Sequence, residues 1–180
     1  MIMIHLPPSR RRVLFLGAGL TAIAACGAGS SPASAASYLA PAAGKAFAQS
    51  PFRKLADQDW RARLPAAAYD VLRHEGTEPA GTSALTDEHR KGVFACAGCQ
   101  LPLFKSDWIF HSGTGWPSFY TAIPGAVETK TDASFDMTRV EYHCAQCLGH
   151  QGHIFEDGPA PTGLRYCNNG VALKFTPNPA

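Results

Sequence analysis

The chain has 180 residues, a length typical of one folded domain with additional segments. Its apolar residues (46%) can bury a core, and its charged residues (17%) are too few for a wholly disordered chain. The formal charge of +2 depends on three arginines within the first twelve residues, so the remainder lacks the basic character of a nucleic-acid-binding protein.

The first 36 residues have the pattern of an export signal. A basic stretch at 9–12 precedes the mostly apolar stretch 13–25, which is too short to cross a bilayer but has the length of a signal-peptide core. The arginine pair resembles a twin-arginine export signal, with Val13 where that motif usually has Phe. We therefore expect a signal peptide over residues 1–36 and a protein exported to the periplasm or cell envelope.

Two processing routes are open for this segment. Small residues at 33–36 suit cleavage there, whereas the stretch before Cys26 resembles a lipoprotein box, in which Cys26 would carry a lipid and attach the protein to a membrane. A disordered or membrane-anchoring N-terminus is the simpler alternative. Residues 37–50 are rich in Ala, Ser, Pro and Gly and are typical of a linker, so we expect the folded domain over 51–177.

Two short helices are expected at the start of the domain. Asp57 and Asp59 can cap a helix through 60–63, because a carboxylate accepts hydrogen bonds from the free N–H groups of a first turn. Pro65 suits the first turn of a second helix, over about 66–73.

After these helices the pattern changes to that of short strands. Runs rich in β-branched and aromatic residues alternate with clusters of Gly, Pro and Asp, as in strands joined by turns. The runs lie at 93–95, 108–110, 140–143, 153–155, 164–167 and 171–175. The sequence therefore predicts a mainly β (α+β) fold, an antiparallel β domain behind a small helical segment.

Two C-x-x-C pairs predict a metal centre. Cys96 and Cys99 form the first pair, and Cys144 and Cys147 form the second. Two thiolates in one tight turn can bind an ion together, so two such turns complete a closed tetrahedral zinc site. The alternatives are two disulfides, which an exported protein can form, or a redox-active pair. We expect one structural zinc ion, because a closed four-sulfur site leaves no position for a substrate.

Cys167 is the cysteine of the domain outside these pairs. Alternation along a strand would place Arg165, Cys167 and Asn169 on one face. A guanidinium beside a thiol favours the reactive thiolate, and an amide can bind a substrate oxygen. These neighbours indicate a reactive site, with an inert buried cysteine as the alternative.

Two further segments offer groups for chemistry. His150 and His153 lie among glycines directly after the second cysteine pair. Because four sulfurs already fill the zinc tetrahedron, these histidines suit structural hydrogen bonding or, for His153, acid–base work. In the glycine-rich segment 112–119, Trp116 either packs in the core or forms the wall of an apolar pocket.

Together these segments resemble the B-type methionine sulfoxide reductases, which reduce the R epimer of methionine sulfoxide. The resemblance runs from about Trp60 to Phe175 and is carried by both cysteine pairs and by residues 72–78, 112–119, 149–158 and 161–167. It implies two antiparallel sheets stapled by a four-cysteine zinc site, with short N-terminal helices. Its implied substrates are methionine sulfoxide and oxidised proteins.

The resemblance also implies roles for single residues. Cys167 would be the nucleophile, and Trp116 would receive the methyl group of the substrate. The remaining active-site and supporting residues would be His150, His153, Arg165 and Asn169. We expect thiolate attack on the sulfoxide sulfur, release of methionine and a sulfenic acid at Cys167, with His153 as the proton source.

The chain departs from the family pattern at three positions. Gln151 and Asn168 stand where the family usually has apolar residues, so the polarity of the pocket is expected to differ. Thr114 stands where many members have the cysteine that closes a disulfide with the nucleophile. We therefore expect a one-cysteine cycle, in which an external thioredoxin-like thiol donor reduces Cys167 directly.

Two rival functions belong to other classes. A non-catalytic, zinc-stapled β module that binds proteins would need the cysteine pairs but not Cys167, Trp116 or the histidines. A zinc-dependent nucleic-acid-binding protein would need a cluster of basic residues, which the near-neutral domain does not offer.

Overall fold

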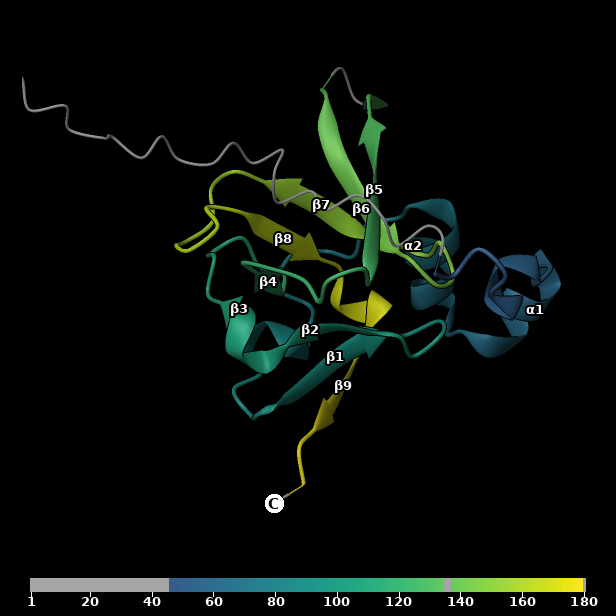
Figure 1. Cartoon of the computed structure of the whole chain (residues 1–180), viewed down its shortest axis with the longest axis horizontal. Helices are drawn as coiled ribbons and strands as arrows, with labels where there is room; N and C mark the ends of the chain where they lie inside the picture. Colours follow the sequence, from purple (N-terminus) through teal and green to yellow (C-terminus); the bar gives the residue numbers. More distant parts are fainter. Residues whose placement is uncertain (1–45, 135–136, 180) are drawn as a thin grey trace, which may run out of the picture. The chain divides into compact units, whose positions relative to one another are not determined.

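A computed structural model describes residues 46–134 and 137–179 (Figure 1). The expected signal peptide over 1–36, with Cys26, and the first part of the expected linker lie outside the described residues. Within the described part of the chain, no helix combines the length and the apolar character that crossing a membrane requires.

Two helices precede the strands, as the sequence predicts. Helix α1 (Asp57–Arg63) begins after Ala56, whose backbone N–H donates to the Asp59 carboxylate at 3.0 Å. Helix α2 (Ala66–His74) buries Leu72, which packs against both cysteine loops. Short 3-10 helices occupy Pro51–Lys54, Ala84–Asp87, Ser106–Trp108 and Gly170–Ala172.

The strands of the described residues form two antiparallel sheets (Figure 1). In the order β2–β1–β9, the smaller sheet consists of Pro102–Lys105, Gly92–Cys96 and Leu173–Pro177. In the order β3–β4–β8–β7–β6–β5, the larger sheet consists of Ile109–Phe110, Ser118–Phe119, Arg165–Asn168, His150–Phe155, Arg139–Cys144 and Val127–Asp132. The prediction of a mainly β fold with two antiparallel sheets is confirmed.

Several strand boundaries differ from the sequence-based prediction. Strands β2, β4 and β5 were not predicted, because β2 begins with a proline, β4 has two residues and β5 is polar along most of its length. The strand predicted at 171–175 begins earlier than the observed strand β9, because Gly170–Ala172 forms a 3-10 turn that ends where β9 starts.

Aromatic side chains fill the core between the two sheets. Phe104 of β2 stacks on Phe119 of β4 with a centroid distance of 4.1 Å, and the edge of Phe94 from β1 meets the same ring at 5.0 Å. Tyr166 of β8 joins this cluster at 6.0 Å from Phe104. Because side chains alternate along a strand, packing Tyr166 into the core turns the neighbouring Cys167 to the other face of the sheet.

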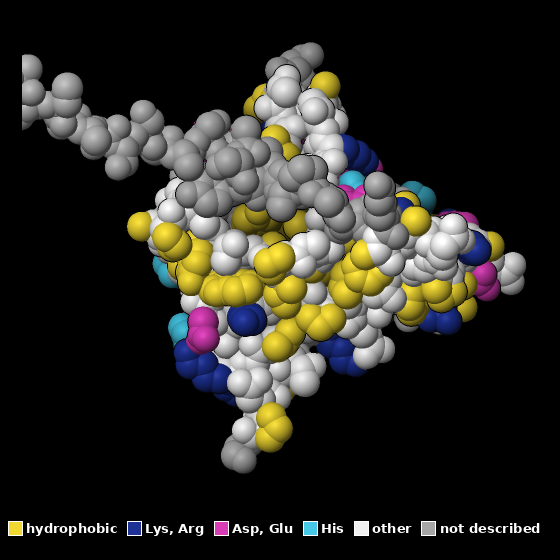
Figure 2. All heavy atoms as spheres, in the orientation of Figure 1, with side chains coloured by type: hydrophobic (Ala, Val, Ile, Leu, Met, Phe, Trp, Pro, Cys, Tyr) yellow, Lys and Arg dark blue, Asp and Glu magenta, His cyan; other side chains and the backbone are white. Residues whose placement is uncertain are grey.

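The surface carries charges of both signs. On the face that Figure 2 shows, hydrophobic side chains form a band, and the Lys and Arg side chains of the described residues are scattered instead of gathered in one basic patch. This distribution agrees with the near-neutral composition of the domain.

Candidate functional site

Cys167 occupies the middle of the larger sheet. In β8 it is paired with Ser118 of β4 on one side and with His153 of β7 on the other. Directly opposed residues of antiparallel strands have their Cβ atoms about 4.5–5.5 Å apart and point to the same face. The register therefore places the side chains of Cys167 and His153 on the same face of the sheet, and both line one pocket.

Gly152 permits this close approach of β7 and β8. A Cβ atom at Gly152 would lie 1.9 Å from the backbone carbonyl oxygen of Cys167, far inside van der Waals contact. A side chain there would push the strand with His153 away from the strand with Cys167. The glycine before His153 is thus required by the geometry of the site.

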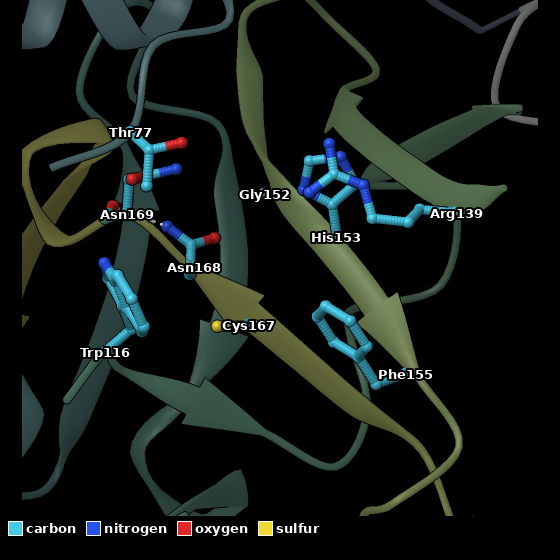
Figure 3. A pocket seen from close by; sticks show the side chains of 9 residues that line it. All are labelled: Thr77, Trp116, Arg139, Gly152, His153, Phe155, Cys167, Asn168 and Asn169. Carbon is cyan, nitrogen blue, oxygen red and sulfur yellow. Dashed lines mark hydrogen bonds between the residues drawn. The ribbon is translucent and has the colours of Figure 1, made fainter. Parts of the chain in front are cut away.

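The side chain of Cys167 faces an open pocket of about 140 Å³. Figure 3 shows Cys167 between two aromatic side chains, Trp116 and Phe155. The Trp116 ring is held in place by its Nε1–H, which donates to the carbonyl oxygen of Glu78 at 3.0 Å. The lining residues are Thr77, Trp116, Arg139, Gly152, His153, Phe155, Cys167, Asn168 and Asn169. Two aromatic walls beside a thiol suit an apolar group that carries sulfur.

Arg165 lies beside this pocket and is not part of its lining. Its Nε and Nη2 each donate to Asp157 at 2.8 Å, and its guanidinium carbon lies 4.4 Å from the centre of the Phe155 ring. Such a planar, two-point pair fixes the guanidinium firmly. Arg165 therefore supports the pocket wall through Phe155 and places a positive charge near Cys167.

Arg165 acts to favour the thiolate of Cys167, the direction that the sequence predicts, but burial outweighs it. Burial raises the pKa of the Cys167 thiol, although the Arg165 charge and a hydrogen bond from Thr114 act in the opposite direction. Asp157 partly cancels the charge of Arg165 and also raises this pKa. Cys167 consequently carries its proton at neutral pH, and its activation requires a base.

His153 has a carboxylate partner that the sequence analysis missed. Its Nε2–H donates to Asp132 Oδ2 at 2.8 Å, since a carboxylate only accepts, and Asp132 also binds Nη2 of Arg139 at 2.6 Å. Burial lowers the pKa of His153, while Asp132 acts to raise it. At neutral pH the imidazole is therefore uncharged, with its proton on Nε2 and with Nδ1 as an acceptor.

His150 does not line the pocket but lies behind His153. The two rings are in edge contact with their centroids 5.4 Å apart, and His150 Nδ1 lies 2.6 Å from Glu141 Oε1. Burial raises the pKa of Glu141, but hydrogen bonds from His143 and His150 outweigh it and bring the value to about 2. Glu141 is thus a buried carboxylate that holds His150 against His153.

Asn169 lines the pocket, but both ends of its amide are engaged with backbone. Its Oδ1 accepts from the N–H of Glu78 at 3.0 Å, and its Nδ2 donates to the carbonyl oxygen of Gln151 at 3.0 Å. The same Glu78 provides the carbonyl that holds Trp116. Asn169 therefore ties the wall of the pocket to β7.

The four cysteines of the two C-x-x-C pairs converge as the sequence predicts. Their Sγ atoms are buried and lie within 4.8 Å of one another, at 3.6 Å for Cys96 and Cys147 and 3.4 Å for Cys99 and Cys144. A disulfide requires about 2.05 Å, so these cysteines are not paired by disulfides. A tetrahedral ion with bonds of about 2.3 Å requires sulfurs about 3.8 Å apart. The cluster fits a metal ion.

The two cysteine loops share one backbone design. The residue after each pair, Gln100 or Leu148, has left-handed backbone with φ of 64° or 60°. Its N–H donates to the carbonyl oxygen of the first cysteine, at 2.8 Å to Cys96 and 2.9 Å to Cys144. This repeated turn directs the two thiols of each loop to one point.

The chain matches a known protein family and is similar in sequence to several named proteins. Residues 64–177 match the family described as SelR domain. A protein of Thiobacillus denitrificans named peptide methionine sulfoxide reductase MsrB is 50% identical over 122 residues, which cover 67% of this chain and 92% of that protein. Proteins of the same name from Leptospira interrogans and Methanosarcina barkeri are 49% identical over 120 residues, with 92% and 84% of their lengths covered.

Proposed function

The chain belongs to the SelR domain family, and from this membership we propose that it reduces methionine sulfoxide, free or within oxidised proteins. The observation that carries the proposal is the placement of Cys167 between Trp116 and Phe155 and opposite His153. A thioether-sized group fits between the aromatic walls, with its sulfur next to the thiol and its oxygen next to an acid–base group.

The first step is a proton transfer within the site. Nδ1 of His153 takes the proton of the Cys167 thiol, because Nε2 is already committed to Asp132. The carboxylate of Asp132 stabilises the imidazolium that forms. This step supplies the thiolate that burial disfavours in the resting enzyme.

The second step transfers oxygen. The thiolate attacks the sulfoxide sulfur, and the imidazolium of His153 gives its proton to the sulfoxide oxygen. The protonated oxygen then moves from the substrate sulfur to the sulfur of Cys167, and the bond that the attack formed between the two sulfurs breaks. Methionine sulfur gains two electrons and Cys167 loses two, becoming a sulfenic acid whose proton is the original thiol proton. No other acid or base is consumed.

The walls of the pocket favour one epimer of the substrate. A sulfoxide sulfur carries four different groups: the methyl group, the rest of the side chain, the oxygen and a lone pair. Fixing the methyl group at an aromatic wall and the oxygen near His153 leaves one configuration that can meet Cys167. We assign this configuration to the R epimer, in line with the family resemblance.

Recycling uses a thiol from another molecule. In the described residues the other cysteines belong to the four-sulfur cluster, and Thr114 offers only a hydroxyl. A thioredoxin-like donor attacks the sulfenic acid, which releases water and leaves a mixed disulfide. A second thiol of the donor then frees Cys167 and leaves with the disulfide.

The cysteine cluster holds one structural zinc ion. Cys96, Cys99, Cys144 and Cys147 would supply all four ligands, so the ion would cross-link the two loops and take no part in oxygen transfer. The N-terminal arginines and the apolar stretch after them support export to the periplasm or cell envelope, with a membrane attachment only if Cys26 is lipidated.

The test is consumption of racemic methionine sulfoxide with dithiothreitol as reductant, with the two epimers assayed separately. The proposed enzyme consumes the R epimer alone, and Cys167→Ser abolishes this activity while zinc content and thermal unfolding stay unchanged. Activity in Cys167→Ser overturns the role of Cys167. A folded, zinc-loaded wild-type chain that consumes neither epimer favours a protein-binding module instead.

A further inference from the structure

A chain of hydrogen bonds crosses the core from the strand of Cys167 to the cysteine cluster. Tyr142 donates its hydroxyl to Asn168 Oδ1 at 2.6 Å. Asn168 Nδ2 donates to the carbonyl oxygen of Asn169 at 2.7 Å and, at 3.5 Å, to Gln151 Oε1. Gln151 Nε2 in turn donates to the Sγ atom of Cys96 at 3.4 Å. All four side chains are fully buried. Every hydrogen bond in the chain points toward the sulfur.

Gln151 is the central member of this chain. A buried amide is costly when its N–H or carbonyl group lacks a partner, because that group has given up its hydrogen bonds to water. The two ends of the Gln151 amide meet Asn168 and Cys96, so each partner satisfies one end. The sequence analysis expected Gln151 to change the polarity of the pocket, but Gln151 is not among the residues that line it. Its side chain extends to the cysteine cluster instead.

Gln151 and Asn168 are the two residues expected above, from the family resemblance alone, to change the polarity of the pocket. The structure shows that they touch each other, across the pairing of β7 with β8. An amide at one position supplies the partner for the amide at the other. The two departures thus form one unit.

We propose that Gln151 and Asn168 are positioning residues of the metal cluster, which hold negative charge on the sulfur of Cys96 and tie the cluster to the strand of the nucleophile. The N–H of Gln151 donates to the sulfur of Cys96. Asn168 orients Gln151 for this contact, and Tyr142 orients Asn168. The inference rests on the metal-binding part of the proposed function.

The physical basis is the charge of the loaded cluster. Four thiolates around a divalent cation leave an excess of negative charge in a buried site, and a fixed N–H donor beside one sulfur lowers the free energy of that charge. Hydrogen bonds in a chain polarise one another, so the Tyr142 and Asn168 bonds strengthen the last bond to sulfur. Loss of such an outer partner typically weakens metal binding by about 10–100-fold.

The experiment uses the full chain with zinc and a competing chromophoric chelator. Gln151→Leu removes the donor at similar volume, and we expect zinc to bind about tenfold more weakly. Asn168→Leu removes the residue that orients Gln151, and we expect a smaller loss. The double variant should lose less affinity than the two single losses combined, since both act through one hydrogen bond. Gln58→Leu, which replaces an exposed glutamine of helix α1 away from the cysteine loops, is the matched control.

A spectroscopic measurement separates this role from a general loss of stability. With cobalt(II) in place of zinc, removal of the N–H donor raises the energy of the sulfur lone pairs, so the sulfur-to-cobalt charge-transfer band of Gln151→Leu moves to longer wavelength. The control keeps the wild-type band. A wild-type band and wild-type zinc affinity in Gln151→Leu overturn the inference. Neither readout involves methionine sulfoxide. A wild type that reduces no sulfoxide would refute the proposed catalysis, and a shifted band in Gln151→Leu would still support this inference.

Discussion

Replacing Asp132 by asparagine tests whether His153 acts as the acid–base group of the site. The amide keeps a carbonyl oxygen near the position of Oδ2 but removes the negative charge that faces His153 Nε2. Two consequences follow for His153. Its pKa falls further below the usual value, because the raising effect of Asp132 is lost, and the imidazolium formed during the reaction loses its counter-ion.

The size of the effect follows from the geometry. A hydrogen bond to a charged group contributes about 1.5–3 kcal/mol. The His153 and Asp132 side chains are 16% and 14% exposed, so solvent screening places the loss in the lower half of this range. About 1.5–2 kcal/mol in the activation free energy corresponds to a kcat about 10–30-fold lower.

The assay is the pH dependence of kcat/KM with dithiothreitol as reductant. Because protonated His153 cannot take the Cys167 proton, activity is present above the pKa of His153 and is lost as the pH falls through it. This acid limb lies below the usual pKa of histidine in the wild type and at still lower pH in Asp132→Asn. At alkaline pH the Cys167 thiol loses its proton to solvent, so no proton is left for the sulfoxide oxygen and activity falls. Burial raises the pKa of Cys167, which sets this alkaline limb, and we expect the limb to be the same in Asp132→Asn.

A control and a refuting outcome complete the test. Asp107→Asn removes a carboxylate that pairs with Lys91 at an exposed site, and it should leave both limbs and kcat unchanged. If Asp132→Asn lowers kcat without moving the acid limb, Asp132 serves only to hold the β5–β6 hairpin. If neither quantity changes, the assignment of His153 as the base is refuted.

Two further predictions concern stability. Removing the metal with a strong chelator should release one ion per chain and lower the midpoint of thermal unfolding by about 10 °C or more, since a structural ion contributes several kcal/mol; a midpoint that does not move in calorimetry would contradict this. Gly152→Ala should lower the free energy of unfolding by about 2 kcal/mol or more, because its Cβ would lie 1.9 Å from the Cys167 carbonyl oxygen. Urea unfolding within about 0.5 kcal/mol of the wild type would show that β7 and β8 separate freely.

Local spacing explains what the sequence could predict of the site. Two cysteines three apart fit a single tight turn, so the convergence of each C-x-x-C pair depends on a few neighbouring residues. The alternation of Tyr166 and Cys167 likewise places one in the core and the other on the opposite face without knowledge of any distant residue.

The missed features depend on contacts between distant segments. Asp132 reaches His153 only because β5, β6 and β7 align in register, and the polar sequence of β5 gave no sign of a strand. The signal that could have found it is Asp132 facing Arg139 across a turn, an opposite-charge pair that closes a hairpin. The protonated state of Cys167 depends on burial, which local sequence does not reveal.

The structure also predicts how the recycling route can be changed. The Thr114 side chain hydrogen-bonds Cys167, so Thr114→Cys places a second sulfur within reach of the nucleophile. A sulfenic acid that meets this thiol forms a disulfide and releases water. After one equivalent of substrate without reductant, the intact mass of the wild type should rise by one oxygen, whereas Thr114→Cys should become lighter by two hydrogens. Thr176→Cys is the control, because Thr176 is exposed on β9 in the other sheet. An internal disulfide at Cys167 in the wild type would refute the one-cysteine cycle, and within the described residues it would require a cluster cysteine to leave its metal site.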